Sequence, residues 1–413
     1  SLQWWNSYEV KPYETLVQEC VEPMINGGKI WMGFQLYQNH LTDPATMDMV
    51  KRVFSYIESI EDNFDKKRIV PYVGVLCDEN QLVNRRGSGV DEMDVDLTSL
   101  YGLNKALTSS GIPYNSVNEK FLVENSDDFK LVIISNDQYV SDELYKELKQ
   151  YVERGGSLLI TGKSGCVDID GNLIKNENFT KLTGVSINGQ YDYPYAYISP
   201  KHKSLTDVIM PKSVLCADEF MKIKTDNAKT LASVTLPYKK MKEINWGEFP
   251  SFSNPWAQTN EPAICLNQYG NGRVCYVCTD IFRGYSGTNN YILKNLIKTL
   301  INEFLIEEKI TISNPTYLEL TFMRSECDDS ILINLLNLVR SVPMREIEQR
   351  RENAICEEIL PVYDTEISFY SKKEPKQAST VVSNHQLMFT YDNNRVSIRV
   401  PKVEIYEGVK IVF

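Results

Sequence analysis

The apolar positions of the chain fall into three successive patterns. In residues 1–68 they recur every three or four positions, which predicts two helices with a short apolar strand at 29–34 between them. In residues 69–310, short apolar runs alternate with amphipathic stretches. In residues 311–413, short runs separated by turn residues predict strands with no helix between them. The chain is therefore expected to contain three regions of different architecture.

The middle region predicts a doubly wound α/β domain. The run 131–134 is apolar throughout, as in a parallel strand whose two faces are both covered, and the runs 70–76 and 157–161 are predicted as strands before and after it in the sequence. Strand–helix–strand units with short loops cross over in the right-handed sense, so we expect a parallel sheet. Residues 263–279 predict a β-hairpin, and a long amphipathic helix is expected at 292–304.

The two flanking regions are smaller. A helix–strand–helix such as residues 1–68 cannot cover all its apolar faces by itself, so we interpret it as the last part of a larger α/β layer. Asp43 followed by Pro44 predicts the start of its second helix. Residues 311–413 predict a small antiparallel β-sandwich.

Composition narrows the class of protein. The 413 residues carry 44 basic and 55 acidic side chains, a net charge of −11 that disfavours nucleic acid as a partner. No apolar run approaches the ~20 residues that a membrane span needs, so no membrane partner is expected. Nine cysteines without clustered spacing suit the reduced thiols of a cytoplasmic protein better than a disulfide scaffold.

A nucleophilic hydrolase is one hypothesis for the middle region. It requires a cysteine or serine on the turn directly after a core strand, with a histidine as the base. The turn after 157–161 carries Gly162 and Lys163, whereas Ser164 and Cys166 come later in the loop, and His202 lies far along the chain. We therefore expect loop roles for Ser164 and Cys166.

The sequence predicts neither a metal site nor a cofactor. Cys275 and Cys278 lie within one predicted strand, where positions three apart point to opposite faces. Residues 168–172 resemble the opening of a calcium loop, but the twelfth position is Phe179 instead of a glutamate. No pair of carboxylates is singled out as a catalytic pair either.

Tryptophans are the candidates for sugar binding. Trp4 and Trp5 precede the first predicted helix, and Trp31 lies on the first predicted strand. An indole face can stack on a sugar ring, although aromatic side chains serve core and interface packing equally well. Both interpretations remain open for these three residues.

The order of elements resembles that of the trimerisation domain of bacterial β-galactosidases and related glycoside hydrolases, which has a class I glutamine amidotransferase-like fold. The segments that carry the resemblance are 73–77, 111–112, 130–144, 151–162, 164–165, 168–171 and 269–274. Residues 26–31 and the helix after them are similar to the last strand and helix of the catalytic barrel in such proteins. Residues 331–337 resemble the start of their C-terminal β-sandwich.

This resemblance implies a parent polypeptide with a catalytic barrel before Ser1. In such proteins the catalytic glutamates lie at the ends of earlier barrel strands, and no residue of this chain matches them. The amidotransferase-like domain of the family lacks its ancestral nucleophile, in agreement with Gly162. Its implied role is contact between subunits and covering of a neighbour's cleft. The resemblance further implies that Trp31, Trp4 and Trp5, in the end of the barrel, line the sugar site from the last barrel strands.

The leading hypothesis is therefore the C-terminal, non-catalytic part of a glycoside hydrolase that forms a homo-oligomer and helps to shape a carbohydrate site. One alternative is a self-standing carbohydrate-binding or assembly protein without catalysis. Another is an amidohydrolase that uses Cys166 or Ser164 with His202.

Overall fold

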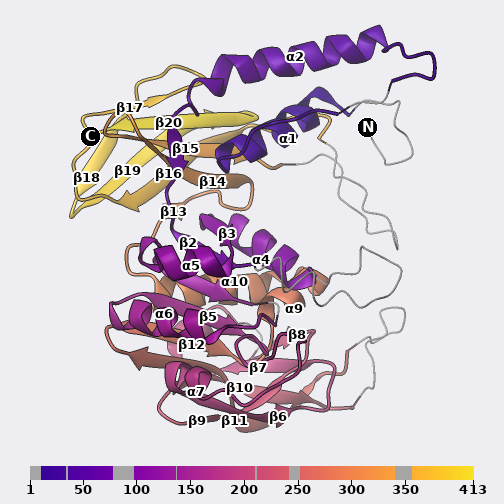
Figure 1. Ribbon diagram of the computed structural model, residues 1–413, viewed down its shortest axis with the longest axis vertical. Coiled ribbons are helices and arrows are strands. Elements are labelled where there is room, and N and C mark those ends of the chain that lie inside the picture. Colours follow the sequence, from indigo (N-terminus) through magenta and orange to yellow (C-terminus); the bar gives the residue numbers. More distant parts are fainter. Residues whose placement is uncertain are drawn as a thin grey trace. The chain divides into compact units, whose positions relative to one another are not determined.

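The computed structural model describes residues 11–33, 36–77, 97–135, 137–209, 212–240, 252–339 and 356–413. The contacts between residues divide the chain into two compact units (Figure 1). The sandwich unit comprises Ser1–Val70, Gly111–Pro113 and Glu308–Phe413. The doubly wound unit comprises Pro71–Ser110 and Tyr114–Glu307.

The doubly wound unit is built on a nine-stranded sheet with the order β3-β2-β4-β5-β12-β11-β10-β7-β8. Its strands are β2 (Val73–Leu76), β3 (Tyr114–Val117), β4 (Leu131–Ile134), β5 (Ser157–Thr161), β7 (Ala196–Pro200), β8 (Val214–Cys216), β10 (Lys229–Pro237), β11 (Pro255–Tyr269) and β12 (Gly272–Val277). From β3 to β12 the pairing is parallel, which confirms the predicted doubly wound sheet. From β12 to β8 it is antiparallel, so the sheet as a whole is mixed.

The predicted hairpin is confirmed as β11 and β12, with a two-residue turn at Gly270 and Asn271. A separate two-stranded sheet pairs β6 (Val185–Gln190) with β9 (Met221–Thr225).

Helices fall into two groups. Their bounds are α4 (Thr98–Thr108), α5 (Glu119–Asn125), α6 (Asp142–Glu153), α7 (Glu177–Thr183), α8 (Lys203–Thr206), α9 (Ile281–Thr288) and α10 (Tyr291–Thr299). The connection from β2 through α4 to β3 runs toward one edge of the sheet, whereas the connections through α5 to β4 and through α6 to β5 run toward the other edge. Because each crossover is right-handed, α4 lies on one face of the sheet and α5 and α6 lie on the opposite face. Accordingly α4 contacts α9 and α10, whereas α6 contacts α5 and α7.

The backbones of α4 and α9 touch. A Cβ atom at Gly102 of α4 would lie 2.0 Å from the carbonyl oxygen of Phe282 in α9. Only glycine permits this approach, which sets the position of the first turn of α9. The predicted helix at 292–304 is α10, continued by a π-helical turn, η2 (Leu300–Leu305).

The sandwich unit contains two antiparallel sheets, which confirms the predicted C-terminal architecture. One has the order β1-β14-β15-β20-β17 and the other β13-β16-β19-β18. The strands are β1 (Lys67–Ile69), β13 (Thr311–Ile312), β14 (Leu318–Ser325), β15 (Ser330–Asn337), β16 (Val362–Tyr370), β17 (Gln377–Thr380), β18 (Phe389–Asp392), β19 (Arg395–Val403) and β20 (Tyr406–Val412).

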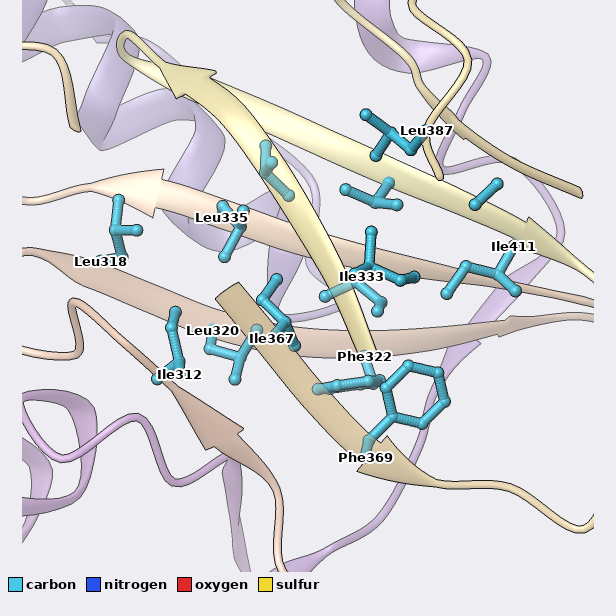
Figure 2. Packing of buried hydrophobic residues seen from close by; sticks show 14 of the residues in the cluster. Ile312, Leu318, Leu320, Phe322, Ile333, Leu335, Ile367, Phe369, Leu387 and Ile411 are labelled. Atoms are coloured by element: carbon cyan, nitrogen blue, oxygen red, sulfur yellow. The ribbon is translucent and has the colours of Figure 1, made fainter. Parts of the chain in front are cut away.

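A single apolar core lies between these two sheets (Figure 2). Ile333 and Leu335 of β15 face Ile367 of the other sheet, and all three are almost fully buried. The rings of Phe322 and Phe369 meet edge to face with centroids 5.6 Å apart. Side chains from both sheets thus interdigitate as in a β-sandwich.

The N-terminal helices α1 (Tyr13–Ile25) and α2 (Pro44–Glu61) share a second apolar cluster with Leu336 and Tyr406 of the sandwich. As predicted, Asp43 caps α2, with its Oδ2 accepting a hydrogen bond from the backbone N–H of Thr46 at 2.6 Å. The predicted strand at 29–34 is wrong, because residues 29–33 form no strand and Phe34 lies outside the described residues. The interpretation of residues 1–68 as the end of a barrel stays a prediction.

Candidate functional site

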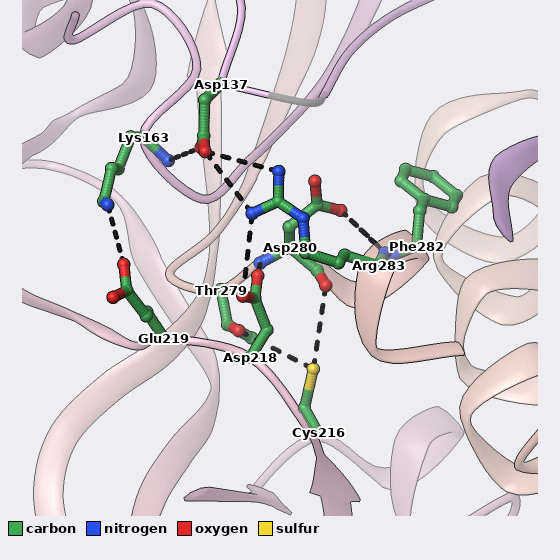
Figure 3. Close-up of polar contacts among 9 residues, drawn as sticks. All are labelled: Asp137, Lys163, Cys216, Asp218, Glu219, Thr279, Asp280, Phe282 and Arg283. Atoms are coloured by element: carbon green, nitrogen blue, oxygen red, sulfur yellow. Dashed lines mark hydrogen bonds and ion pairs between the residues drawn. The ribbon is translucent and has the colours of Figure 1, made fainter. Parts of the chain in front are cut away.

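Charged side chains gather at the carboxyl ends of the parallel strands. Taken in chain order, strands β3-β2-β4-β5-β12 have the winding 2-1-3-4-5, in which ligands usually bind at this edge of the sheet. Asp137 follows β4, Lys163 follows β5 and Asp280 follows β12. The loop after β8 adds Asp218 and Glu219. Figure 3 shows these side chains around Arg283 of α9, and we call this set the Arg283 cluster.

The guanidinium of Arg283 lies between two carboxylates. Its Nη1 is 3.4 Å from Oδ2 of Asp137 and 3.6 Å from Oδ1 of Asp218. Asp280 holds the start of the same helix, because its Oδ1 accepts hydrogen bonds from the backbone N–H groups of Phe282 at 3.0 Å and Arg283 at 3.2 Å. Arg283 is thus fixed by its own helix and by two loops.

Further contacts join the loops to one another. The backbone N–H of Asp280 donates to Oδ2 of Asp218 at 3.2 Å, and that of Lys163 donates to Oδ1 of Asp137 at 3.2 Å. The Nζ of Lys163 forms an ion pair with Glu219 at 2.6 Å. The loops after β4, β5, β8 and β12 are therefore linked through one polar network.

Burial and charge act in opposite directions on these carboxyls. Burial raises the pKa of Asp218 to about 7, against the lowering effect of Arg283 and with the help of the negative charge of Asp280. Burial also raises the pKa of Asp280, again opposed by Arg283. For Glu219 burial is the largest single effect and raises the pKa, but the hydrogen bond and charge of Lys163, together with Gln190 and Arg283, outweigh it, so the pKa is lowered. With four carboxylates and two cations, the cluster carries excess negative charge that protonation of Asp218 relieves.

The position that a nucleophile requires is occupied by glycine. Gly162 follows β5 with a φ of +61°, a left-handed conformation that side chains rarely adopt. A Cβ atom there would lie 3.3 Å from Oδ1 of Asp137 and 3.4 Å from Cβ of Asp280. The Arg283 cluster therefore fills the space into which a nucleophilic side chain would project.

The residues of the hydrolase hypothesis are not brought together. Cys166 is 2% exposed, and burial raises the pKa of its thiol, which disfavours the reactive thiolate. Nδ1 of His202 accepts a hydrogen bond from the backbone N–H of Ser204 at 3.3 Å, and its ring meets Phe304 edge to face. Within the described ranges no hydrogen bond joins His202 to Cys166 or to Ser164.

The predicted sugar-binding tryptophans are described only in part. Trp4 and Trp5 lie outside the described residues. Trp31 is 89% exposed, and a Cβ atom at Gly33 would lie 2.8 Å from Cη2 of its indole. The indole of Trp31 thus lies over Gly33, and most of its surface faces solvent.

Sequence reasoning missed the Arg283 cluster. Two signals were present, since Asp280 comes directly after a predicted strand and Asp137 three positions after another, where a polar residue is expected at the carboxyl edge. Asp218 had no such signal, because β8 is only three residues long.

The structure was also searched for a metal site and for a membrane span. Among the residues that the structure describes, no group of three or more His, Cys, Asp or Glu side chains is placed to hold a metal ion. In the same part of the chain, no helix has the length and apolarity needed to cross a membrane.

Fold and site together define a class of protein: a doubly wound domain in which described charged side chains at the usual ligand-binding edge pair with one another, combined with an antiparallel sandwich. The sequence profile of the beta-galactosidase trimerisation domain matches residues 101–307, half of the chain. The chain belongs to this family. Comparison with curated protein sequences finds no match.

Solved structures share the fold over almost the whole chain. Alpha-L-fucosidase isoenzyme 2 from Paenibacillus thiaminolyticus is 16% identical with a TM-score of 0.78, over 99% of this chain and 59% of that one. The beta-galactosidase from Bacillus circulans sp. alkalophilus is 14% identical with a TM-score of 0.63, over 98% of this chain and 54% of that one. The beta-galactosidase from Rahnella sp. R3 is 12% identical with a TM-score of 0.59, over 98% and 53%. The chain thus spans little more than half the length of these enzymes.

Because the pKa of Asp218 is raised in the folded protein, the free energy of unfolding should depend on pH. Between about pH 4 and 7 the folded state retains a proton on Asp218 that the unfolded state releases, so the free energy of unfolding falls as the pH rises through this range. We expect Asp218→Asn, which cannot ionise, to remove roughly 1–3 kcal/mol of the loss between pH 5 and 8 in urea unfolding.

Two controls accompany this measurement. Asp207→Asn tests the same substitution at an exposed position of the same unit. Glu319→Gln removes a separate contribution, because burial raises the pKa of Glu319 in the sandwich unit to about 7. An unchanged pH dependence in Asp218→Asn would show that Asp218 is ionised in the folded protein across this range.

Proposed function

We propose that this chain is the C-terminal, non-catalytic portion of a glycoside-hydrolase-like protein, in which the doubly wound unit assembles copies of the polypeptide and the chain helps to shape a carbohydrate site. The observation that carries the proposal is the family match over residues 101–307, joined to a fold shared with more than half of several glycosidases. The parent's activity is part of the proposal, and its sugar is a β-galactoside or an α-L-fucoside by analogy with those enzymes.

The Arg283 cluster supports a non-catalytic role for this chain. Glycoside hydrolysis needs two carboxyl groups across an open cleft, one able to donate a proton and the other free to attack or to activate water. Here Asp280 caps α9, and Asp137 and Asp218 are committed to Arg283. We therefore place the catalytic pair in a barrel that this chain does not include, as the resemblance implies.

An exposed aromatic pair is the candidate contact for assembly. Tyr238 directly follows β10 and is 63% exposed, and Trp256 lies at the start of β11 and is 68% exposed. Their rings meet edge to face, with centroids 4.9 Å apart. Large rigid aromatic side chains contribute most to binding energy at protein interfaces. Nearby, Lys240 forms an ion pair with Asp192, which supplies the polar rim typical of such contacts.

The chain is expected to form a homo-oligomer, with a trimer of three 47.4 kDa copies as the specific expectation. Light scattering after size exclusion measures this mass directly. We expect Trp256→Ala with Tyr238→Ala to weaken assembly at least about tenfold, since each is an anchor of the type that dominates interfaces. Tyr291→Ala, at a residue 67% exposed on α10, is the matched control. A mass of 47.4 kDa at every concentration would contradict the assembly role.

Trp31 is proposed to line the carbohydrate site. One face of its indole covers Gly33, while the exposed remainder can stack on the C–H face of a sugar ring. Trp4 and Trp5 belong to the same proposal on the basis of the resemblance. None of the nine cysteines, all of which lie within the described residues, forms a disulfide, which supports a reducing compartment such as the cytoplasm.

We expect methyl β-D-galactoside or methyl α-L-fucoside to quench the fluorescence of Trp31 in a saturable way. Trp31→Ala should abolish this response, because stacking on an aromatic face supplies most of the contact for a single sugar ring. Trp256→Ala, at an exposed tryptophan of the other unit, should leave it intact. A response that survives Trp31→Ala would remove Trp31 from the site.

A further inference from the structure

The outer face of the four-stranded sheet in the sandwich unit forms a trough with a volume of about 580 Å³. It is lined by residues of β13, β16 and β19 and by the chain from Met388 into β18. A volume of this size lies within the range of small-molecule sites. The trough shares no residue with the Arg283 cluster and does not include Trp31.

The pairing register aligns four hydroxyl side chains across this sheet. Thr311 pairs with Ser368, Ser368 with Ser397, and Ser397 with Thr390. The residues next to them in sequence form a row on the core side of the sheet: Ile312, Ile367, Ile398 and Phe389. Figure 2 shows Ile312 and Ile367 within that core. Because successive side chains in a strand point to opposite faces, the hydroxyl row lines the outward face.

A charged pair lies beside the hydroxyl row. Glu366 of β16 is directly opposite Arg399 of β19, and both are exposed. Nε of Arg399 is 3.2 Å from Oδ1 of Asp364, whereas its Nη groups make no ion pair or hydrogen bond with described residues. Within the same ranges the carboxylate of Glu366 accepts no hydrogen bond. Met388, 90% exposed, adds an apolar surface to the trough.

This combination of groups selects among classes of ligand. A free anion is repelled by Glu366, and a divalent cation prefers several carboxylate or carbonyl ligands, of which the trough offers one free carboxylate. A sugar ring presents vicinal hydroxyls, each both donor and acceptor, together with an apolar C–H face. Glu366 can accept from two such hydroxyls and Arg399 can donate to others. Within the hydroxyl row the Oγ of Ser397 donates to that of Ser368 at 3.0 Å, which leaves the hydroxyls of Ser368 and Thr390 able to donate to a ligand.

We propose that this trough is a carbohydrate-binding site for a neutral mono- or disaccharide unit of a glycan. Glu366 and Arg399 bind the ring hydroxyls, and the side chain of Met388 packs against the ring. The site is independent of the proposed assembly role, since it uses another unit of the chain. In a glycoside hydrolase it would hold the substrate polymer away from the reacting bond.

Methionine methyl NMR on the whole chain provides a readout located at the trough. The protein, labelled with 13C at the methionine methyl groups, is titrated with lactose, cellobiose and L-fucose, and Met388→Leu assigns the Met388 signal. We expect a saturable shift of that signal with at least one probe, at a dissociation constant of about 1 mM. Arg399→Met should weaken binding about tenfold, as should Glu366→Gln, because each removes a polar contact to the ring.

The matched control is Lys373→Met, which removes an exposed ion pair with Asp329 in the same unit and leaves the trough intact. Its binding should equal that of the unmodified chain. The proposal is overturned if no probe shifts the Met388 signal at about 50 mM, or if Arg399→Met and Glu366→Gln bind as well as the control. Neither outcome affects the oligomeric mass or the response of Trp31, so failure here is distinguishable from failure of the proposed function.

Discussion

Compensation of charge around Arg283 is the constraint on which the doubly wound unit depends. A guanidinium that is largely withdrawn from water must be paired, since an unpaired buried charge costs several kcal/mol. Its partners come from the loops after β4 and β8, while Asp280 after β12 holds its helix. Satisfying this one side chain therefore fixes the relative positions of loops that are far apart in sequence. The close packing of Gly102 against Phe282 also fixes the start of this helix.

In the described part of the carboxyl edge, this arrangement commits the charged side chains to one another. In doubly wound folds that edge is where ligands and nucleophiles are placed. Here Gly162 stands at the turn, and the carboxylates of the Arg283 cluster crowd the space beside it. Function is then expected on outer surfaces of the chain, at the aromatic pair Tyr238 and Trp256 and at the trough of the sandwich unit.

Much of the fold could be predicted because its signals are local. The run 131–134 is apolar throughout, the run 157–161 is apolar at its three central positions, and helix caps flank both, so the parallel core followed from pattern alone. The prediction of a strand at 29–34 was wrong because an apolar run does not show whether a neighbouring strand is present to pair with it. The exposed side chain of Trp31 fits the apolar pattern as well as a buried side chain would. The barrel interpretation of that region and the role of Trp31 stay predictions.

The candidate sites needed information that the sequence does not carry. The Arg283 cluster joins Asp137 to a residue 146 positions away, and the hydroxyl row exists only through the register of four strands. Single positions such as Thr311 or Ser397 carry no signal of that row. The sheet topology had to be known before the Arg283 cluster or the hydroxyl row could be recognised.

The most direct test of this account is a double-mutant cycle on Arg283 and Asp218, read by hydrogen exchange of the backbone amides of β4, β5 and β12 at pH 8. The account predicts that Arg283→Met lowers the free energy of opening by about 3 kcal/mol, and that the effect of Asp218→Asn is more favourable by roughly 1–2 kcal/mol in the Arg283→Met variant than in the unmodified chain. Additive effects of the two substitutions would contradict it, because they would mean that Arg283 and Asp218 do not compensate each other's charge.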